Sequence, residues 1–440
     1  MTVRRLSPRV SRSFRPSLEP LEERSLPSGV HPSHDPLGGD REVSVMTRNL
    51  YFGTELDQAT AALASGDPNA IVAAVSQTWA NIVASNIPER ADAIADEIKD
   101  ARPLLIGLQE VALFRTGAPD SFFGNPTRAE TVRFDFLDSL LTELSERGLH
   151  YQVVAVHNGF DAEATGFTAP GVLEDIRLTD RDVVLARSDL PPSQLKLSNV
   201  QVGTFNTIAS VPIGNTGATF DVLRGWVSVD AKVRGQTFRF ISAHLEVDSD
   251  VNPILNQIQF AQAQEILNGP ANTNLPVLLV GDFNSRADGT GTPTYASLVG
   301  AGFDDVWTET HPGQLGNTFG HAPDLRNTTV NLTQRLDLVL FRGDLQPIDS
   351  TVVGDELSDR TASGLWPSDH AGVVASLGLH VRPAHRQFSA FLDWAHVFGS
   401  DGDERPGHSR SSSSSGSGLL DSALLDLLAH EALRGHGSRS

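Results

Sequence analysis

Short apolar segments alternate with segments of helical periodicity across residues 42–380, and this alternation constrains the fold most strongly. Apolar runs bounded by turn residues are typical of buried strands, whereas apolar residues recurring three and four positions apart are typical of helices. No internal repeat is visible in the sequence. The pattern therefore predicts one mixed α/β domain over residues 42–380 rather than several modules. The expected strands are Val43–Thr47, Leu104–Leu108, Tyr151–Val156, Val183–Ala186, Trp226–Val233, Phe238–Ala243, Val277–Val280, Leu336–Phe341 and Val373–Leu379.

The helical segments carry ordinary start and stop signals. In the third of them, Ala91, Ile94 and Ile98 mark one apolar face, Pro88 stands at the start and Pro103 follows the end. Proline fits the first turn of a helix but not its interior, so these two residues bracket the segment. The expected helices are 56–65, 68–84, 88–100, 131–147 and 254–268.

The two ends of the chain differ from this domain in composition. Residues 1–41 are rich in Arg, Ser and Pro without apolar periodicity, which predicts a disordered arm. Within it, Leu18–Ser28 resembles a short arm of some bacterial surface and secreted proteins, so we expect an extracellular or cell-surface location and leave a cytoplasmic one open. Residues 381–440 read as a low-complexity linker followed by a short amphipathic helix around residues 419–428.

Composition excludes several classes of protein. The chain has no Cys, so a disulfide framework, a thiolate metal site and a cysteine nucleophile are all ruled out. Its apolar runs are much shorter than the roughly 18 residues that a membrane span needs, so no integral membrane segment is expected. The net charge is −20, and the two ends are nearly balanced, so the excess lies in residues 42–380. A domain this acidic needs a local device to bind phosphate, most simply a divalent cation.

Polar residues follow four of the expected strands within a few positions of the strand end. Asn49 comes after the first strand, Glu110 after the second, His244 after the strand 238–243, and Asp282 with Asn284 after the strand 277–280. In layered α/β folds, sites gather at strand ends, because the sheet holds the side chains rigidly while the loops leave them accessible. Each of these residues alone would be an ordinary turn residue, so it is their repetition that predicts a site.

A carboxylate also stands inside an otherwise apolar strand. Asp337 lies in the run Leu336–Phe341, where an unpaired charge would be costly, so it should have a specific partner. Arg335 is one candidate, although neighbouring strand residues face opposite sides of a sheet. His370, in the segment Trp366–His370 before the last strand, is the other, since a carboxylate-held imidazole is a positioned general base.

Taken in order, these segments resemble the endonuclease/exonuclease/phosphatase family of metal-dependent phosphoesterases. The resemblance covers residues 43–379 and implies a deoxyribonuclease I-like fold, a four-layer α/β/β/α sandwich with two mixed β-sheets. Segments 53–87 and 157–180 look like insertions that rim the site. The motifs that carry the resemblance are Thr47–Asn49, Leu108–Glu110, Ala243–Leu245, Gly281–Asn284, Arg335–Asp337 and Ser368–His370.

The resemblance also implies a metal site. Glu110 would be the principal ligand of Mg²⁺, Asn49 would lie close to the ion, and Asp369 would approach it. The residue types agree with this, because Mg²⁺ favours hard oxygen ligands, usually one or two carboxylates with water and substrate phosphate. Mn²⁺ is the alternative ion.

The remaining motif residues receive catalytic roles from the same resemblance. Asp282 and Asn284 would hold the attacking water or a second ion, and His244 would donate to a phosphate oxygen. His370, oriented by Asp337, would take the proton from the water as general base. The implied chemistry is in-line displacement at phosphorus without a covalent enzyme intermediate.

We therefore expect a monomeric Mg²⁺-dependent hydrolase of phosphodiester bonds, a phosphodiesterase or a nuclease of the endonuclease/exonuclease type. A nuclease usually offers a basic strip, and only Arg224, Lys232, Arg234 and Arg239 cluster in sequence, so a phospholipid head group or an inositol phosphate stays open as substrate. A lipid-acting enzyme would be expected to carry an exposed apolar hairpin, for which Phe122–Phe123 is the candidate. A non-catalytic binding or scaffold module is the alternative of another class.

Overall fold

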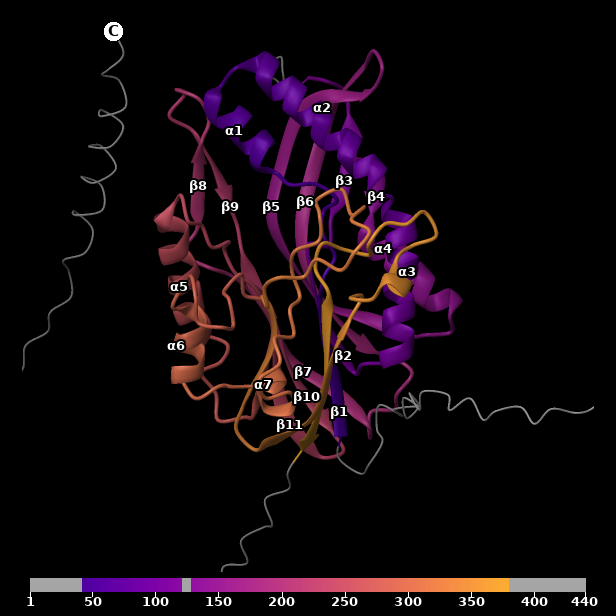
Figure 1. Ribbon diagram of the computed structural model, residues 1–440, viewed down its shortest axis with the longest axis vertical. Helices are drawn as coiled ribbons and strands as arrows, with labels where there is room; N and C mark the ends of the chain where they lie inside the picture. Colours follow the sequence, from indigo (N-terminus) through magenta and orange to yellow (C-terminus); the bar gives the residue numbers. More distant parts are fainter. Residues whose placement is uncertain (1–41, 121–127, 380–440) are drawn as a thin grey trace, which may run out of the picture. The chain divides into compact units, whose positions relative to one another are not determined.

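The computed structural model describes residues 42–120 and 128–379, which form two face-to-face β-sheets with helices on both outer sides (Figure 1). This arrangement confirms the expected four-layer α/β/β/α sandwich. The N-terminal arm, the C-terminal linker and helix, and Phe122–Phe123 all lie outside the described residues. None of the described helices is both long and apolar enough to cross a membrane.

The first sheet has the strand order β15-β16-β1-β2-β6-β3-β4, and β5 pairs with β6. Strands β1 and β2 are parallel, while β16 runs antiparallel to β1 and β6 runs antiparallel to β2. The strands are β1 (Glu42–Asn49), β2 (Leu105–Gln109), β3 (Leu113–Gly117), β4 (Thr131–Asp135), β5 (Tyr151–Ala169), β6 (Val172–Arg187), β15 (Leu345–Val353) and β16 (Gly372–Leu379).

The second sheet has the order β13-β14-β12-β11-β10-β7, with β11 and β12 parallel. A separate hairpin is formed by β8 (Ala209–Pro212) and β9 (Thr219–Val222). The strands of the second sheet are β7 (Leu195–Thr204), β10 (Gly225–Val233), β11 (Gln236–His244), β12 (Val277–Asp282), β13 (Asp304–Asp305) and β14 (Asp337–Arg342).

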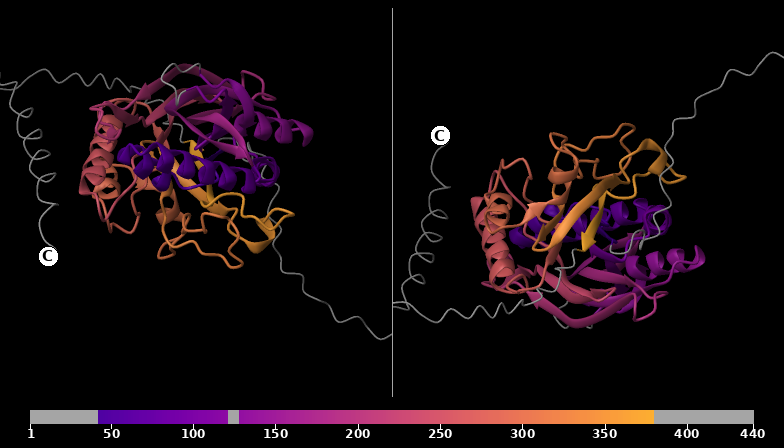
Figure 2. Two further views of the ribbon diagram at one scale, coloured as in Figure 1. Left: turned by 90° about the horizontal axis from the view of Figure 1, so that it is seen from above. Right: turned by 90° about the horizontal axis from the view of Figure 1, so that it is seen from below.

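The helices form the two outer layers. Helices α3 and α4 flank the first sheet and α5 and α6 flank the second, whereas α1 and α2 (indigo) lie toward one edge of the sandwich (Figures 1 and 2). Their bounds are α1 (Asp57–Ser65), α2 (Pro68–Ala84), α3 (Ile87–Ala101), α4 (Phe136–Glu146), α5 (Pro253–Asn268), α6 (Thr294–Gly300) and α7 (Val306–Thr310), with a 3₁₀ turn at Leu357–Asp359.

Alternating side chains divide the apolar residues between three cores. In β1, Val43 and Val45 pack between the two sheets, whereas Met46 packs against the helices of the first layer. In β12, Leu278 faces the other sheet and Leu279 faces the layer of α5 and α6. Because successive strand residues point to opposite faces, a strand covered on both sides must be apolar throughout, which explains the continuous apolar runs.

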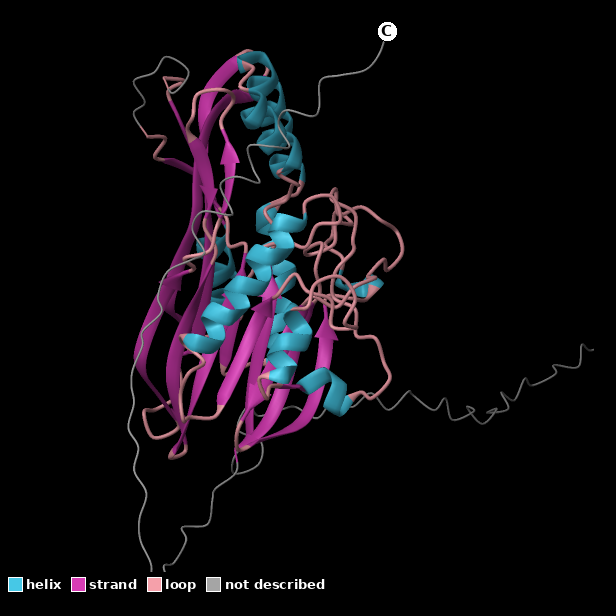
Figure 3. Cartoon of the chain, turned by 90° about the vertical axis from the view of Figure 1, so that its left-hand side faces the viewer, coloured by secondary structure: helices cyan, strands magenta, loops and turns pink. Residues whose placement is uncertain are grey.

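One expected helix and two expected strands, Tyr151–Val156 and Val183–Ala186, have clearly different bounds in the structure. The helix expected at 131–147 is wrong in its first turn, because residues 131–135 form β4, which pairs with β3. The helix begins only after Asp135, whose carboxylate accepts the backbone N–H groups of Leu137 and Asp138 as an N-cap. Strands β5 and β6 run through the segment 157–180 as one long hairpin, which extends beside the helices at one end of the sandwich (Figure 3).

Hydrogen bonds join the two sheets near one end of the sandwich, where the strands β1, β2, β11 and β12 terminate. This end of the sandwich is the edge at which the polar residues gather. Gly107 of β2 faces the second sheet, and a Cβ there would lie 2.4 Å from Ser242 Oγ, so the sheets approach closely at this point. One residue further along this face, Gln109 accepts the Thr47 hydroxyl at 3.2 Å and donates to Ser242 Oγ at 3.1 Å. This polar bridge fixes the relative positions of strand ends that belong to different sheets.

Candidate active site

A second amide, that of Asn49, also links strand ends of the two sheets. Asn49, the last residue of β1, donates its Nδ2 to Glu110 Oε1 at 3.2 Å and to Asp282 Oδ2 at 3.0 Å. Its Oδ1 accepts the backbone N–H of Tyr51 at 2.9 Å, which fixes the orientation of the amide. The register places Asn49 beside Gln109 in the parallel pair β1–β2. Glu110 and Asp282, far apart in sequence, are therefore held around one side chain.

The backbone is strained at three points around these groups. Tyr51, Glu110 and Asn284 have φ values of 60°, 55° and 49°, in the left-handed region that non-glycine residues rarely occupy. Each such residue costs on the order of 1–3 kcal/mol and persists where the surroundings fix it. Glu110 is fixed in part by the Phe52 N–H, which donates to its Oε2 at 3.1 Å. At these three residues the backbone leaves the extended conformation of the preceding strand, and the chain turns at the edge.

The segment after β12 turns sharply at the second sheet. Gly281 has φ 148°, and a Cβ there would lie 1.9 Å from the carbonyl oxygen of Ala243, so only glycine fits. Asp282 Oδ1 then accepts the Asn284 N–H at 2.9 Å, and Asn284 Nδ2 donates to the Leu245 carbonyl at 3.0 Å. Phe283 between them is fully buried under the outer helices. The Phe anchors the turn while both polar neighbours line the cavity at the edge.

Asp337 and His370 form a buried pair. Asp337 opens β14, opposite Asp282 in the antiparallel register, and its Oδ2 lies 2.8 Å from His370 Nδ1. The other ring nitrogen, Nε2, lies 3.7 Å from Asp282 Oδ2. Ser368 holds this histidine loop on β1, because its hydroxyl donates to the Asn49 carbonyl at 2.9 Å and accepts the His370 N–H at 3.1 Å. The alternative partner considered from sequence, Arg335, does not contact Asp337 and instead pairs with Asp305 at 2.5 Å.

The charges at this edge shift one another's pKa values. Burial opposes the charged imidazole of His370, but the carboxylates of Asp337, Asp282 and Asp369 outweigh it and raise its pKa to about 10. Burial raises the pKa of Asp369 to about 7, and the nearby carboxylate of Glu110 adds to the effect while His370 opposes it. Asp282 is also buried, but His370 and His244 hold its pKa below the usual range. The edge therefore carries more negative charge than its cations neutralise.

A second polar cluster surrounds His244, the last residue of β11. Asp182 of β6 lies 3.5 Å from His244 Nδ1 and 3.2 Å from His157 Nδ1, so one carboxylate holds two imidazoles. Arg224 Nη1 lies 2.9 Å from His244 Nδ1 and 3.6 Å from Asp180 Oδ2. Burial raises the pKa of Asp180 to about 7, helped by Asp182, whose own pKa the two histidines hold at about 2 against burial.

All the site residues expected from sequence line or border this edge. Each of them except Asn49 and Asp337 lines one cavity at the edge, and these two contact Asp282 and His370, which do line it. They are Asn49, Glu110, His244, Asp282, Asn284, Asp337, Asp369 and His370.

Sequence reasoning did not assign Asp180, Asp182 and Arg224, nor the role of His157 as a second partner of Asp182. The available signal was two carboxylates two residues apart just before the apolar run Val183–Ala186, which places both on one face of β6.

The residues present could hold a cation in two ways. Ligand atoms of Asp282, Asp337 and His370 lie within 4.8 Å of one another, but His370 Nδ1 and Asp337 are already bonded to each other. The carboxylates of Glu110 and Asp369 form a second set, half-buried and open to the cavity. In the described part of the chain, several buried carboxylate oxygens near the edge have no hydrogen-bond partner, among them Asp337 Oδ1 and Glu246 Oε2. A hard-oxygen donor set with unsatisfied charge fits a divalent ion.

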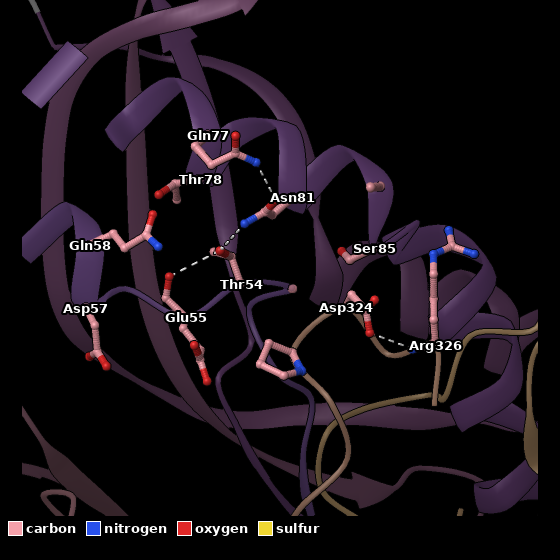
Figure 4. Close-up of a pocket in the computed structure, with 13 residues that line it drawn as sticks. Thr54, Glu55, Asp57, Gln58, Gln77, Thr78, Asn81, Ser85, Asp324 and Arg326 are labelled. Carbon is pink, nitrogen blue, oxygen red and sulfur yellow. Dashed lines mark hydrogen bonds between the residues drawn. The ribbon is translucent and has the colours of Figure 1, made fainter. Parts of the chain in front are cut away.

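A separate polar pocket lies beside the edge. It has a volume of about 360 Å³ and is formed by α1, α2, the segment 53–57 and the loop 323–326 (Figure 4). Asn81 Nδ2 donates to the Thr54 hydroxyl at 3.2 Å, and Gln77 Nε2 donates to Asn81 Oδ1 at 2.9 Å. The two amides of α2 therefore form a hydrogen-bonded chain that ends at Thr54. Thr54 and Glu55 line both this pocket and the cavity at the site.

A layered α/β sandwich whose carboxylates and imidazoles converge at one edge of both sheets has the groups needed for hydrolysis. Residues 82–370 match the model of the Endonuclease/Exonuclease/phosphatase family, and the chain belongs to this family. That membership makes it a phosphoesterase-type hydrolase. No curated protein matches the chain.

Solved structures of similar fold cover 77% of the chain. An endonuclease/exonuclease/phosphatase family protein from Leptotrichia buccalis C-1013-b is 16% identical, is itself covered to 100%, and gives a TM-score of 0.46. A family protein from Bacteroides thetaiotaomicron is 16% identical, covered to 96%, with a TM-score of 0.45. Humanized D. rerio TDP2 with 14 mutations is 16% identical, covered to 99%, with a TM-score of 0.43.

Proposed function

We propose that the protein is a divalent-metal-dependent phosphodiesterase in which His370 acts as the general base. The observation that carries the proposal is the buried pair of His370 Nδ1 and Asp337 Oδ2 at 2.8 Å, which leaves Nε2 directed toward Asp282 and the cavity. A carboxylate on Nδ1 fixes the ring and the tautomer, so that Nε2 is the atom that exchanges a proton.

Glu110 and Asp369 would hold the metal ion, Mg²⁺ or Mn²⁺, and Asn49 orients Glu110 by donating to it. Their chemistry supports this assignment, because both are carboxylates at the cavity and burial beside other carboxylates makes the charged form of Asp369 costly. When bound, the ion would supply positive charge to phosphate oxygens and to the leaving oxygen. His370 is kept free for proton transfer in this arrangement.

The cluster around His244 would bind the phosphoryl oxygens. His244 and Arg224 both line the cavity, and their positive charge is supported from behind by Asp182 and Asp180. Burial and Arg224 disfavour the charged imidazole of His244, but Asp182 and Asp282 outweigh them and raise its pKa. A charged donor fixed in a water-poor site stabilises developing negative charge more strongly than one in bulk water.

Hydrolysis then needs two proton transfers, one from the attacking water and one to the leaving oxygen. A water near Asp282 and Asn284 attacks phosphorus, and the neutral form of His370 accepts its proton at Nε2 as the new oxygen–phosphorus bond forms. The bond from phosphorus to the leaving oxygen breaks in line, its electron pair stays on that oxygen, and the released alkoxide takes up a proton from solvent water. No covalent bond to the protein is formed.

The structure gives a nucleic-acid substrate little additional support. The four basic residues that cluster in sequence do not form a strip, since Arg224 is buried against His244 and Arg239 pairs with Asp230 at 2.7 Å. A phosphodiester that carries an apolar group is the second candidate substrate, because the cavity has apolar walls beyond the site.

The test is hydrolysis of bis(4-nitrophenyl) phosphate with Mg²⁺, with Mn²⁺ and with chelator. We expect metal-dependent release of nitrophenol, and a loss of about 10²–10⁴-fold in kcat/KM for His370→Gln. The matched control is His311→Gln, a half-buried histidine that does not line the cavity. Unchanged activity in chelator would contradict metal dependence, and a His370→Gln rate within tenfold of the wild type would contradict the base assignment. A protein that binds no Mg²⁺ and cleaves no phosphodiester would instead be a scaffold.

A further inference from the structure

The candidate active site opens into a cavity whose far walls are apolar. The cavity has a volume of about 390 Å³, and Glu110, Asp282 and His370 line one end of it. From there it continues between α1 and α2 on one side and the hairpin β5–β6 with β9 on the other. The walls come largely from segments 53–87 and 157–180, the two segments that the sequence marked as insertions.

Six side chains define what we call the apolar chamber: Leu56, Leu63, Val75, Phe160, Leu178 and Phe220.

The side chains that line the chamber pack against one another. Phe160 packs edge-on against Phe52 and Phe220, with ring centroids 5.8 Å and 5.9 Å apart. Helix α2 is fixed on β5, because Ser76 Oγ accepts the Phe167 N–H at 2.7 Å, and a Cβ at Gly166 would lie 2.7 Å from Val75 Cγ1. The two walls are therefore fixed to each other, and the space between them is preformed rather than a gap between independent segments.

The charges around the chamber select against an extended polyanion. Among the described residues that line the cavity, Arg224 is the only Lys or Arg, and it is engaged with His244 and Asp180. Glu55 and Asp57 stand exposed at α1, and Glu163 lines the β5 wall. A second or third phosphate entering the chamber would meet these carboxylates without a cation. A ligand with one phosphate at the site and an uncharged apolar portion beyond it meets no such penalty.

We propose that the apolar chamber binds the hydrocarbon chain of a phosphate ester, so that the substrate carries one phosphate and an alkyl or acyl chain. The inference rests on the proposed phosphodiesterase function and gives it a substrate class. The chain lies along Leu56, Leu63 and Phe160 while the phosphate lies at Glu110 and His370. Removing each methylene from water favours binding, by about fourfold per methylene where burial is complete.

The experiment uses the full chain and 4-nitrophenyl esters of methyl, butyl and octyl phosphate with Mg²⁺. The leaving group is the same throughout, so only the second substituent changes. We expect kcat/KM to rise about two- to fourfold per methylene from methyl to butyl, and further to octyl. The 4-nitrophenyl ester of thymidine 5′-phosphate serves as the comparator with a nucleoside in place of the chain.

A matched pair of variants on α1 locates the effect. Ala59 lines the cavity, so Ala59→Phe fills the chamber, whereas Ala61 is exposed on the same helix and does not line it. We expect Ala59→Phe to lower kcat/KM for the octyl ester at least tenfold and to leave the methyl ester unchanged. Ala61→Phe makes the same change on the same helix and should leave both esters unchanged.

The possible outcomes separate the two proposals. Hydrolysis of the methyl ester without any dependence on chain length, or an Ala59→Phe variant that acts on all esters alike, overturns the chamber and leaves the phosphodiesterase intact. A thymidine ester preferred over the octyl ester also overturns it, in favour of a nucleoside. If no ester is cleaved, the proposed function fails, and the chamber is then judged by calorimetric binding of octylphosphonate, which Ala59→Phe must abolish and Ala61→Phe must not.

Discussion

Replacing Asp337 by Asn tests whether a buried carboxylate makes His370 a base. The substitution keeps the shape of the side chain but removes the charge that lies 2.8 Å from His370 Nδ1. An amide can donate to Nδ1, which places the ring proton on Nε2, the atom that must accept a proton from water. Burial raises the pKa of Asp337 itself, so the neutral amide should be tolerated by the fold.

The expected loss follows from what a general base contributes. Proton transfer by a positioned group is worth about 10²–10⁴-fold, which corresponds to about 3–5 kcal/mol of transition-state stabilisation. The carboxylate of Asp337 is also the largest influence that raises the pKa of His370, toward about 10 and against burial. Its removal should therefore lower that pKa, so the acidic limb of the profile of kcat/KM against pH should move to lower pH while the rate at pH 10 falls.

The assay is kcat/KM for a nitrophenyl phosphodiester with saturating Mg²⁺ between pH 5.5 and 10, with melting temperatures measured alongside. Asp230→Asn is the matched control, because Asp230 also pairs with a basic side chain, Arg239, yet does not line the cavity. A rate at pH 10 within tenfold of the wild type, or a lower rate with an unmoved acidic limb, would refute the pairing as the source of the base.

Two further predictions concern stability. The pKa of Asp369 is raised to about 7, so ionising this carboxyl destabilises the metal-free folded state. The free energy of unfolding should therefore fall as pH rises from about 4 to 7. In chelator, Asp369→Asn should thus melt above the wild type at pH 8 and close to it at pH 5, and Mg²⁺ should raise only the wild type. Gly107→Ala should cost about 1–3 kcal/mol in urea unfolding, since its Cβ would lie 2.9 Å from Val280 Cγ2, whereas Gly300→Ala, with open space around it, should not.

The positions of the site residues could be predicted because they follow from strand geometry. Asn49, Glu110, His244 and Asp282 each end or follow a strand that is largely buried and carries a short apolar run, and such runs are the clearest signal in the sequence. The parallel pairs β1–β2 and β11–β12 bring these ends to one edge. The partner of Asp337 was predictable for a related reason, since a buried carboxylate needs a donor and few are available.

Other features depend on contacts that no local pattern encodes. Asp182 meets His244 only because β6 and β11 belong to sheets that stack, so the sequence left its role undecided. Residues 131–135 form a strand because β3 offers an edge, and the Asp135 cap then sets the start of α4. The chamber residues Leu63 and Phe160 read as ordinary core residues, because periodicity does not tell a buried wall from a wall that faces a cavity.

Charge at the edge explains why an acidic protein can act on phosphate. The cationic groups there are Arg224 and the two histidines with raised pKa values, His244 and His370. The carboxylates that face them are Glu110, Asp180, Asp182, Asp282, Asp337 and Asp369. Even with Asp180 and Asp369 partly protonated near neutral pH, this edge cannot attract a phosphate by itself. A divalent ion reverses the balance locally, so substrate binding and metal binding should be coupled, and the phosphate should bind weakly wherever the ion is removed.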